Sequence, residues 1–473
     1  MIDKIRNFKN LSPAAKASLA LLFANMVLKG LSLISGPIFT RIMPSYQYGI
    51  VSTFMSWQMM LSTIVTLNLG SGVFNNGMLE FREDRDTFQF SLAVTSIFSA
   101  IIFFLVYLVF HAPLDRLLGL SKELVYFLFL YFLLVPIYGY WSGRQRYEFK
   151  YKALTLITIL MAVASLGLSL VAVLSVEPEH SASAKIITSE APNVLVALFF
   201  FFYIGIKAKF RFKKKYITYA LKFNIPLIPH YFSMYVLSSS DRIMISKMVN
   251  TSATAIYSVA YTVGMVINIL WTSIEASLSP WIYEQIETGK KEAIRKRTFQ
   301  IMVFFAFMCV LCALFAPEII AILAPAEYYD GVYVIPSIAA SAFFIAAYSI
   351  YMRVELFYKQ TKFAMIATTI TAGLNLLLNY VFILKYGFIA AGYTTLFCYL
   401  LLYILHYMNV KRRGYDDAFS NRKIMILAIS VVLVSILLNF VYAYTIVRCI
   451  FIAIIILIGL VNRKRIISII RGA

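Results

Sequence analysis

Apolar stretches of about twenty residues recur along the whole chain, with short polar gaps between them. Each is long enough to cross a bilayer as an α-helix, which takes about 20 residues. Windows bounded by charged residues predict about fourteen such helices, at 17–39, 48–69, 88–110, 124–141, 153–174, 185–206, 223–245, 252–276, 298–323, 332–352, 363–384, 387–408, 423–443 and 445–462. Arg448 interrupts the last one, which leaves a tilted or re-entrant segment as an alternative there.

The positions of Lys and Arg provide an independent test of this layout, because cytoplasmic loops of membrane proteins carry an excess of basic residues. If both termini are cytoplasmic, most of the 43 Lys and Arg residues fall in inner loops. The predicted outer connections hold Arg41, Arg116, Lys122, Lys185, Lys247, Lys385 and Arg448. The pattern therefore predicts an all-α, multi-pass membrane protein with its N-terminus inside.

Composition agrees with this fold class, since 61% of the residues are hydrophobic and only 14% are charged. The net charge of +21 is dispersed over the cytoplasmic loops, where it favours anionic membrane lipids as partners and argues against nucleic acid. The basic run from Lys207 to Lys222 fits the same interpretation.

A short internal repeat suggests a duplication. Arg41-Ile42-Met43 is followed by Tyr48-Gly49-Ile50-Val51-Ser52, and Asp241-Arg242-Ile243-Met244 is followed by Ala255-Ile256-Tyr257-Ser258-Val259. An even number of helices separates the copies, so both halves would have the same topology around a central cavity. We therefore expect a six-helix bundle at 1–206, a basic linker at 207–222, a second six-helix bundle at 223–410, and two further helices with a basic tail at 411–473.

The first predicted helix carries a polar stripe, because Asn25, Lys29, Ser32 and Gly36 recur on one face. Lys29 falls near the bilayer midplane, where a charge costs about 3 kcal/mol on insertion scales. It is expected to face a wet cavity, and a snorkelling or paired lysine is the alternative.

The seventh predicted helix carries Tyr231, Tyr235 and Arg242 on one stripe and Asp241 on the neighbouring one. Aromatic rings stack on sugar faces and a guanidinium binds phosphate in bidentate fashion, so this stripe fits a sugar-bearing anion. The alternative is an interfacial aromatic belt in which Arg242 reaches headgroups. Pro226 and Pro229 predict a kink early in the helix.

Two further acids lie at membrane depth, Glu190 and Glu275. Together with Asp241 they are candidates for binding a coupling ion, H⁺ or Na⁺. No catalytic constellation, nucleotide motif, cofactor site or metal site is predicted, and the Cys309-x-x-Cys312 spacing is interpreted as packing. The chain is therefore not expected to be an enzyme.

The segment from Arg41 to Ser52 resembles the junction of helices 1 and 2 in bacterial polysaccharide flippases of the O-antigen type. Pro226, Pro229 and the stretches Ser239–Ile245 and Ala255–Tyr261 are similar to that family's signature in helices 7 and 8. These flippases belong to the multidrug, oligosaccharidyl-lipid and polysaccharide exporter superfamily. Helix number, orientation and the two extra C-terminal helices extend the resemblance over essentially the whole chain.

The resemblance implies export of a lipid-linked oligosaccharide, typically on undecaprenyl pyrophosphate, across the bacterial cytoplasmic membrane by alternating access. It implies a role in lipopolysaccharide O-antigen or capsule biosynthesis, and it allows polysaccharide polymerase machinery as a partner. Lys29, Arg41 and Arg242 become candidate phosphate contacts, although Arg41 and Arg242 would alternatively gate the outer mouth. Asn25, Tyr231 and Tyr235 complete the expected substrate-binding set.

Two other functions stay open from the sequence. A cation-coupled multidrug exporter of the same superfamily would generally have twelve helices and acidic cavity residues, whereas the midplane charge here is Lys29. A non-transporting membrane scaffold would need neither a buried charge nor duplicated halves.

Overall fold

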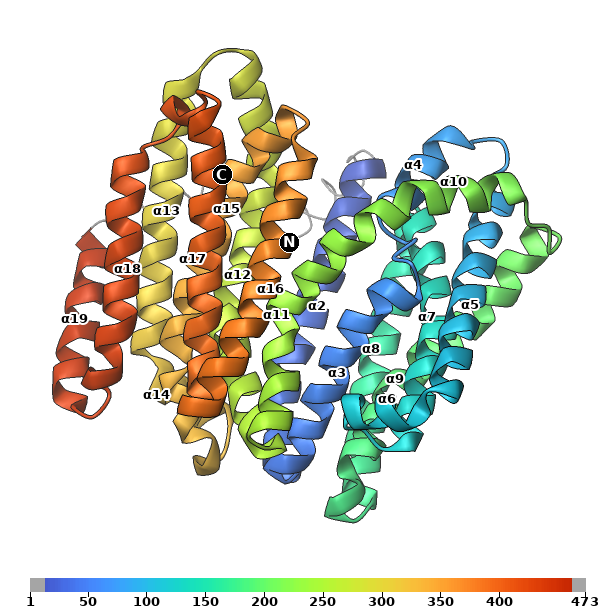
Figure 1. The fold of residues 1–473 in the computed structure, drawn as a ribbon, viewed down its shortest axis with the longest axis horizontal. Coiled ribbons are helices and arrows are strands. Elements are labelled where there is room, and N and C mark those ends of the chain that lie inside the picture. The colour runs from blue at the N-terminus through green and yellow to red at the C-terminus, as the bar shows by residue number, and fades with distance from the viewer. Residues whose placement is uncertain (1–12, 462–473) are drawn as a thin grey trace, which may run out of the picture. The chain divides into compact units, whose positions relative to one another are not determined.

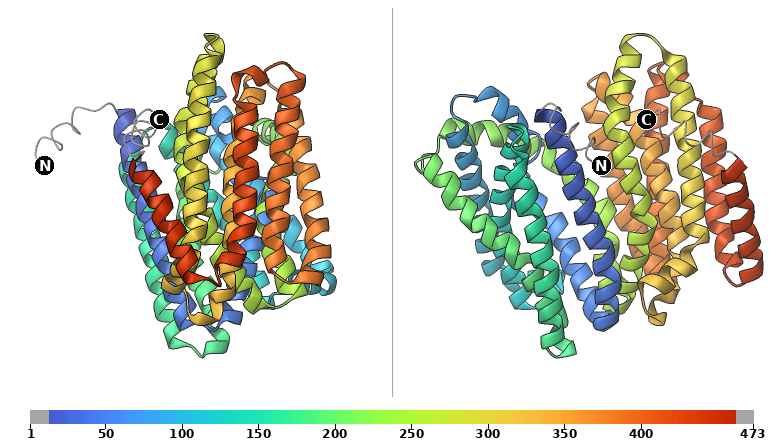
Figure 2. Two further views of the ribbon diagram at one scale, coloured as in Figure 1. Left: turned by 90° about the vertical axis from the view of Figure 1, so that its left-hand side faces the viewer. Right: turned by 180° about the vertical axis from the view of Figure 1, so that it is seen from behind.

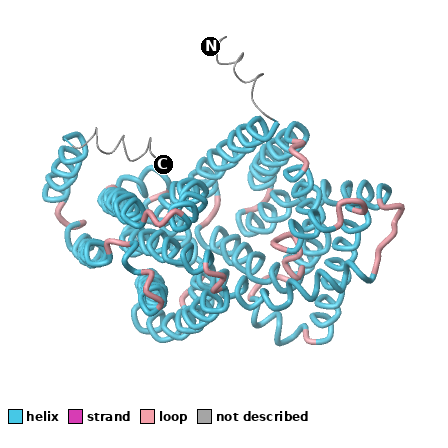
Figure 3. The backbone as a smooth tube through the Cα atoms, turned by 90° about the horizontal axis from the view of Figure 1, so that it is seen from above, coloured by secondary structure: helices cyan, strands magenta, loops and turns pink. Residues whose placement is uncertain are grey.

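A computed structural model describes residues 13–461 of the chain, and within that range it contains helices and connecting loops with no β-strand (Figure 3). The basic residues Lys4, Arg6, Lys9, Arg463, Lys464, Arg465 and Arg471 lie outside the described residues. The chain divides into two compact units, Met1–Phe232 and Ser233–Ala473. The prediction of an all-α polytopic membrane fold is confirmed.

The first unit holds nine complete α-helices in its described part, and Figure 1 labels most of them. They are α2 (Pro13–Ile42), α3 (Ser45–Val65), α4 (Val73–Glu80), α5 (Arg85–Val109), α6 (His111–Leu118), α7 (Lys122–Tyr147), α8 (Tyr151–Ser175), α9 (Ser181–Lys207) and α10 (Lys214–Asn224), with short 3₁₀ turns η1 (Pro178–His180) and η2 (Ile225–Leu227).

The unit boundary lies within α11 (Ile228–Met248), whose longer part belongs to the second unit. The helices that follow are α12 (Thr251–Glu287), α13 (Lys291–Leu314), α14 (Ala316–Leu323), α15 (Ile335–Phe357), α16 (Thr361–Tyr386), α17 (Ile389–Arg412), α18 (Asn421–Val441) and α19 (Thr445–Val461), with 3₁₀ turns η3 (Ala326–Tyr333) and η4 (Asp416–Ala418). Figures 1 and 2 show α18 and α19 at the margin of this unit.

Each predicted membrane segment overlaps at least one helix, and eleven helices in the described range are long and apolar enough to cross a membrane. The predicted segments 48–69, 223–245 and 445–462 correspond to α3, α11 and α19, which are not among these eleven helices. Three boundaries were predicted wrongly. The segment 223–245 is interrupted by η2 at Pro226, and the segment 298–323 breaks at Phe315 between α13 and α14. Helix α12 runs on past Pro280 to Glu287 and ends shortly before Gly289.

The first unit is held together by an aromatic core. The rings of Trp141 on α7 and Phe200 on α9 are stacked with centroids 3.9 Å apart, and Tyr140 on α7 bonds Ser96 on α5. Because a membrane removes most of the hydrophobic driving force between helices, this close packing and the interhelical hydrogen bond are what bind them together.

The second unit is built around α15, which is buried on nearly every face and packs against α12, α13 and α17. Its sequence is rich in Ala and Ser, and small residues let neighbouring backbones approach closely. A Cβ atom on Gly264 of α12 would come within 2.7 Å of Ile338 on α15, so that approach requires glycine. The central helix therefore positions the side chains of three neighbours.

The predicted linker contains a helix, α10, which is anchored on the start of α5. Lys213 and the Tyr216 hydroxyl both donate to the carboxylate of Asp84, at 2.5 Å and 2.7 Å. Burial raises the pKa of Asp84, but the hydrogen bonds from Lys213, Thr87 and Tyr216 outweigh it and lower that pKa to about 2. The carboxylate form thus stabilises the contact between α10 and α5.

This anchor predicts a pH-dependent attachment of α10. The depressed pKa means that the stabilisation is complete above the ordinary Asp value of 3.8 and is lost as pH falls from about 4 towards 2. Asp84→Asn should abolish the dependence and raise amide exchange in α10 at pH 5, as measured by hydrogen–deuterium exchange of the detergent-solubilised protein. Asp86→Asn, which breaks the ion pair with Arg144 instead, is the matched control and should leave α10 protected. Equal exchange in all three proteins would refute the anchor.

Candidate functional site

A buried carboxylate, Asp241 on α11, is the centre of a polar network in the second unit. Its two oxygens accept hydrogen bonds from the Tyr257 hydroxyl at 2.5 Å, from Asn379 Nδ2 at 2.6 Å and from the Thr395 hydroxyl at 2.8 Å. The side chain of Asp241 has no exposed surface. Burying a charge is costly unless it is well hydrogen-bonded, and these three donors supply that compensation.

The network extends through two asparagines on α16. Asn375 and Asn379 are four residues apart and therefore share one face of that helix. Asn379 donates to Asn375 Oδ1 and accepts from the Thr394 hydroxyl, while Ser240 donates to Asn375 Oδ1. We call Asp241, Tyr257, Asn375, Asn379, Thr394 and Thr395 the Asp241 network.

The short connection between α16 and α17 helps to bring these groups together. Gly387 adopts φ +73°, a left-handed conformation that glycine reaches without the penalty other residues incur. The chain therefore reverses directly after α16. On α17, Thr394 comes beside Asn379 and Thr395 beside Asp241. The result is a cluster of carboxylate, amide and hydroxyl oxygens, and oxygen atoms of these kinds are the ligands that hard cations prefer.

Arg242, the residue after Asp241, is half-buried and fixed in place by two contacts. Its guanidinium carbon lies 4.2 Å from the centre of the Tyr261 ring on α12, and Nη1 donates to the Ser238 carbonyl at 3.0 Å. Stacking on a ring orients the planar guanidinium and leaves its remaining N–H donors for an anion. Tyr235, two turns before Arg242, is also half-buried.

The other residues of the predicted seventh-helix stripe do not all belong to this cluster. Tyr231 falls in the first unit, where its ring lies 5.7 Å from that of His230. A substrate-binding role for Tyr231 and Tyr235 stays a prediction.

The first unit holds a second buried carboxyl group, Glu190 on α9. Asn193 donates to it at 2.7 Å, and the side chain of Gln58 on α3 also hydrogen-bonds to it. Tyr131 on α7 in turn hydrogen-bonds to Gln58. Three helices therefore converge on Glu190, much as four converge on Asp241.

Lys185, which was predicted as a cation of an outer connection, lies within α9. Its ammonium nitrogen is 4.2 Å from the centre of the Phe39 ring on α2 and 4.7 Å from that of Tyr48 on α3. Gln47 holds the same region by bonding Glu179 O at 2.7 Å and Ala182 N at 2.9 Å. The sequence pointed to this region only through Tyr48 in the repeated motif. It gave no indication that Lys185 contacts Tyr48, because the two residues lie far apart in the chain.

The polar residues predicted to form a stripe on α2 are exposed, as are several apolar residues on other faces of that helix. Asn25, Lys29 and Ser32 are exposed on the first unit, and none of the ion pairs formed within residues 13–461 includes Lys29. Arg41, in the last turn of α2, is exposed and donates from Nη1 to the Pro37 carbonyl at 2.9 Å. Their contact with substrate stays a prediction.

Glu275 on α12 forms an ion pair with Arg353 on α15. The sequence analysis had placed Arg353 in an inner loop and had given Glu275 no partner.

Nearby helices hold another buried pair that sequence analysis missed. His406 Nδ1 on α17 lies 2.7 Å from Glu355 Oε2 on α15, and Asn409 donates to Glu355 Oε1 at 2.7 Å. Glu355 and His406 lie on different apolar helices, 51 residues apart in the chain, so no spacing rule links them.

Two family models match the chain. The model described as polysaccharide biosynthesis protein matches residues 14–286, and the model described as MatE matches residues 226–381. No curated protein matches the chain. The first match covers more than half of the residues, including the repeated motifs and the Asp241–Arg242 segment.

Solved structures share the fold at low sequence identity. A structure titled lipid II flippase MurJ in an inward closed conformation is 18% identical with a TM-score of 0.62, covering 96% of this chain and 100% of that one. An inward-facing multidrug resistance MATE family transporter of the MOP superfamily is 14% identical with a TM-score of 0.59, covering 84% and 98%. An outward-facing transporter of the same description is 14% identical with a TM-score of 0.51, covering 85% and 95%.

Proposed function

The chain belongs to the polysaccharide biosynthesis protein family, and on that premise we propose that it moves a lipid-linked oligosaccharide from the inner to the outer leaflet of the bacterial cytoplasmic membrane. The carrier lipid is of the undecaprenyl pyrophosphate type, and the mechanism is alternating access. The observation that carries the proposal is the position of Arg242, whose guanidinium is stacked on Tyr261 directly beside the buried Asp241.

Arg242 has the chemistry that a pyrophosphate needs. A guanidinium held flat against a ring keeps a fixed fork of N–H donors, which matches two phosphate oxygens at once. Lys29 and Arg41 on α2 add two exposed cations, and Asn25, Tyr231 and Tyr235 add hydrogen-bonding and stacking groups for the sugars. Each of these residues is proposed as a substrate contact on its own unit.

The Asp241 network is the proposed coupling site, and H⁺ or Na⁺ is the proposed coupling ion. Its carboxylate and amide oxygens lie within one cluster, so binding a cation there would change the hydrogen bonds between α11, α12, α16 and α17. Glu190 is a second candidate, because it too is buried among polar partners. Glu275 is a third candidate, although Arg353 already neutralises it.

The lipid tail needs an apolar path that stays within the bilayer. An apolar groove of about 210 Å³ lies between α13 and α18, lined by Val303, Ala306, Phe307, Val310, Leu427, Ser430, Val431 and Val434. Arg448 holds α19 beside it by donating to Glu318 at 2.5 Å. We assign this groove between α13 and α18 to the tail.

A second candidate function is a cation-coupled multidrug exporter. The MatE match over residues 226–381 and the fold of the MATE transporters support it. The exposed cations Lys29 and Arg41 favour an anionic substrate instead, because like charges would repel a cationic drug.

Deletion of the gene in its host distinguishes the flippase from the multidrug exporter. We expect loss of surface glycan, whether O-antigen or capsule, with the lipid-linked intermediate accumulating in the inner leaflet. The measurement is glycan display together with the inner and outer pools of intermediate, and complementation with the unchanged chain is the control. Normal display combined with altered drug susceptibility would refute flipping and support the exporter.

A further inference from the structure

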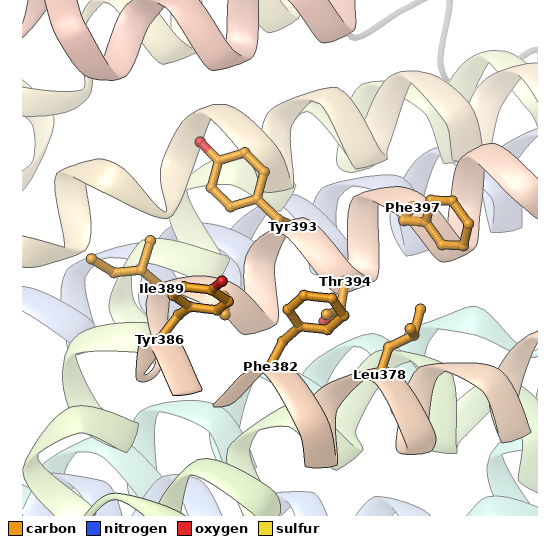
Figure 4. Close-up of a pocket in the computed structure, with 8 residues that line it drawn as sticks. Leu378, Phe382, Tyr386, Ile389, Tyr393, Thr394 and Phe397 are labelled. Carbon is orange, nitrogen blue, oxygen red and sulfur yellow. The ribbon is translucent and has the colours of Figure 1, made fainter. Parts of the chain in front are cut away.

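Helices α16 and α17 form an apolar groove that is not part of the proposed substrate site. Its volume is about 610 Å³, and Figure 4 shows side chains of both helices around it. The lining residues are Leu378, Phe382, Tyr386, Ile389, Ala390, Tyr393, Thr394 and Phe397. We call this cavity the α16–α17 groove.

Large apolar side chains in the groove are partly exposed on the second unit. Phe382, Tyr386 and Phe397 are each between 39% and 59% exposed, although they are large and apolar. An empty groove would deprive these rings of dispersion contacts on one side, so hydrocarbon should fill it. This identifies the occupant as lipid rather than protein or water.

The length of the groove matches one leaflet. Leu378, Phe382 and Tyr386 follow one another at four-residue spacing along α16, which spans about 12 Å of helix. Half of a hydrocarbon core is about 15 Å thick. The groove ends at the Gly387 turn, which the charge pattern predicts to face the outside. It therefore suits one acyl chain of a lipid in that leaflet.

A cation lies at the Gly387 end of the groove. Lys385 is exposed, and its ammonium nitrogen is 5.1 Å from the centre of the Tyr386 ring, which lines the groove. None of the ion pairs formed within residues 13–461 involves Lys385. A tyrosine and a lysine at headgroup depth complement an anionic headgroup.

One residue of the groove lining, Thr394, also belongs to the Asp241 network. Thr394 lines the groove, and its hydroxyl donates to Asn379, which in turn donates to Asp241. An acyl chain in the groove would therefore keep water away from the back of that network. Low local water content strengthens every hydrogen bond within it.

We propose that the α16–α17 groove is a binding site for an anionic phospholipid of the leaflet at the Gly387 end. One acyl chain packs between Leu378, Phe382 and Phe397, and the phosphate lies at Lys385. The site is separate from the tail groove at α13 and α18, so it does not depend on which substrate the protein moves.

Native mass spectrometry of the full chain, released from mixed phosphatidylglycerol and phosphatidylcholine vesicles, tests the site. The unchanged chain should retain one phosphatidylglycerol in preference to phosphatidylcholine. Lys385→Gln should lower that preference about fivefold, since a basic side chain near the membrane surface contributes about 1 kcal/mol. Lys122→Gln, which removes another exposed cation of a predicted outer connection, is the matched control and should change nothing.

A second variant tests the acyl chain rather than the headgroup. Ala390→Trp fills the groove and should abolish retention of phosphatidylglycerol. If Ala390→Trp fails to fold, Lys385→Gln still tests the proposal. Equal retention of both lipids by the unchanged chain, unaffected by Lys385→Gln, would overturn the proposal by showing bulk boundary lipid only. Displacement of the bound lipid by equimolar polyprenyl phosphate would also overturn it, because the groove would then be a second tail site.

Discussion

Asp241→Asn should reduce transport at least about tenfold while leaving the protein folded. The substitution keeps the size of the side chain and one acceptor oxygen, but it removes the charge that Tyr257, Asn379 and Thr395 surround. A hydrogen bond to a charged group contributes about 1.5–3 kcal/mol, and about 1.4 kcal/mol corresponds to a factor of ten. Export of the lipid-linked intermediate in the complemented deletion strain is the measurement.

Stability in the presence of ions gives a second readout for the same substitution. If the Asp241 network binds Na⁺, added NaCl should raise the melting temperature of the unchanged chain more than an equal concentration of choline chloride. Asp241→Asn should abolish that difference. If H⁺ is the coupling ion, neither protein should respond to Na⁺, and the transport defect should persist at every pH tested.

Glu355→Gln is the matched control for Asp241→Asn. Glu355 is likewise a buried carboxylate of the second unit, but it pairs with His406 and Asn409 outside the network. The substitution should affect stability more than transport, because the buried side chains of His406 and Asn409 would share one acceptor oxygen fewer. An equal transport defect in both variants would contradict the assignment of Asp241 as the coupling residue.

Arg242→Ala should also lower export about tenfold or more. The change removes the guanidinium stacked over Tyr261 and with it the proposed bidentate contact to pyrophosphate. Arg242→Lys keeps the charge but not the planar fork, so it should restore only part of the activity. The measurement is the ratio of outer-leaflet to inner-leaflet intermediate at matched expression.

Arg297→Ala provides the comparison for Arg242→Ala. The guanidinium of Arg297 lies over the Trp281 ring at 4.7 Å, so it makes the same kind of contact in the same unit. Each stacked pair contributes about 0.5–2 kcal/mol, and the two variants should lose similar stability. Normal export in Arg242→Ala, or an equal defect in Arg297→Ala, would argue against a substrate contact at Arg242.

Much of the fold could be predicted because the membrane restricts the choice. A segment that crosses hydrocarbon must satisfy its own backbone, so apolar runs of sufficient length become helices. The predicted segments missed helical structure where polar residues outside the apolar runs can bond to water, because there the backbone is not forced to satisfy itself. The basic stretch after Lys207 formed α10, and α12 continued to Glu287 beyond the apolar run.

The candidate site was predicted only residue by residue. Asp241 and Arg242 stood out because charges are costly at membrane depth. Their partners did not, since Asn379 and Thr395 lie 138 and 154 residues further along the chain and look like ordinary helix residues. The contact of Lys185 with Phe39 could not be predicted for the same reason, because Phe39 lies on a different helix.

The sequence by itself determined that this is an all-α membrane protein, where its helices lie, and which buried charges need an explanation. These properties follow from hydrophobicity and length, which act locally along the chain. Only the tertiary structure decided that Asp241 is surrounded by donors from three other helices and that Glu190 is held by Gln58 and Asn193. Those pairings depend on how helices distant in sequence pack, and helical periodicity fixes the face that a residue occupies but not the neighbour that it meets.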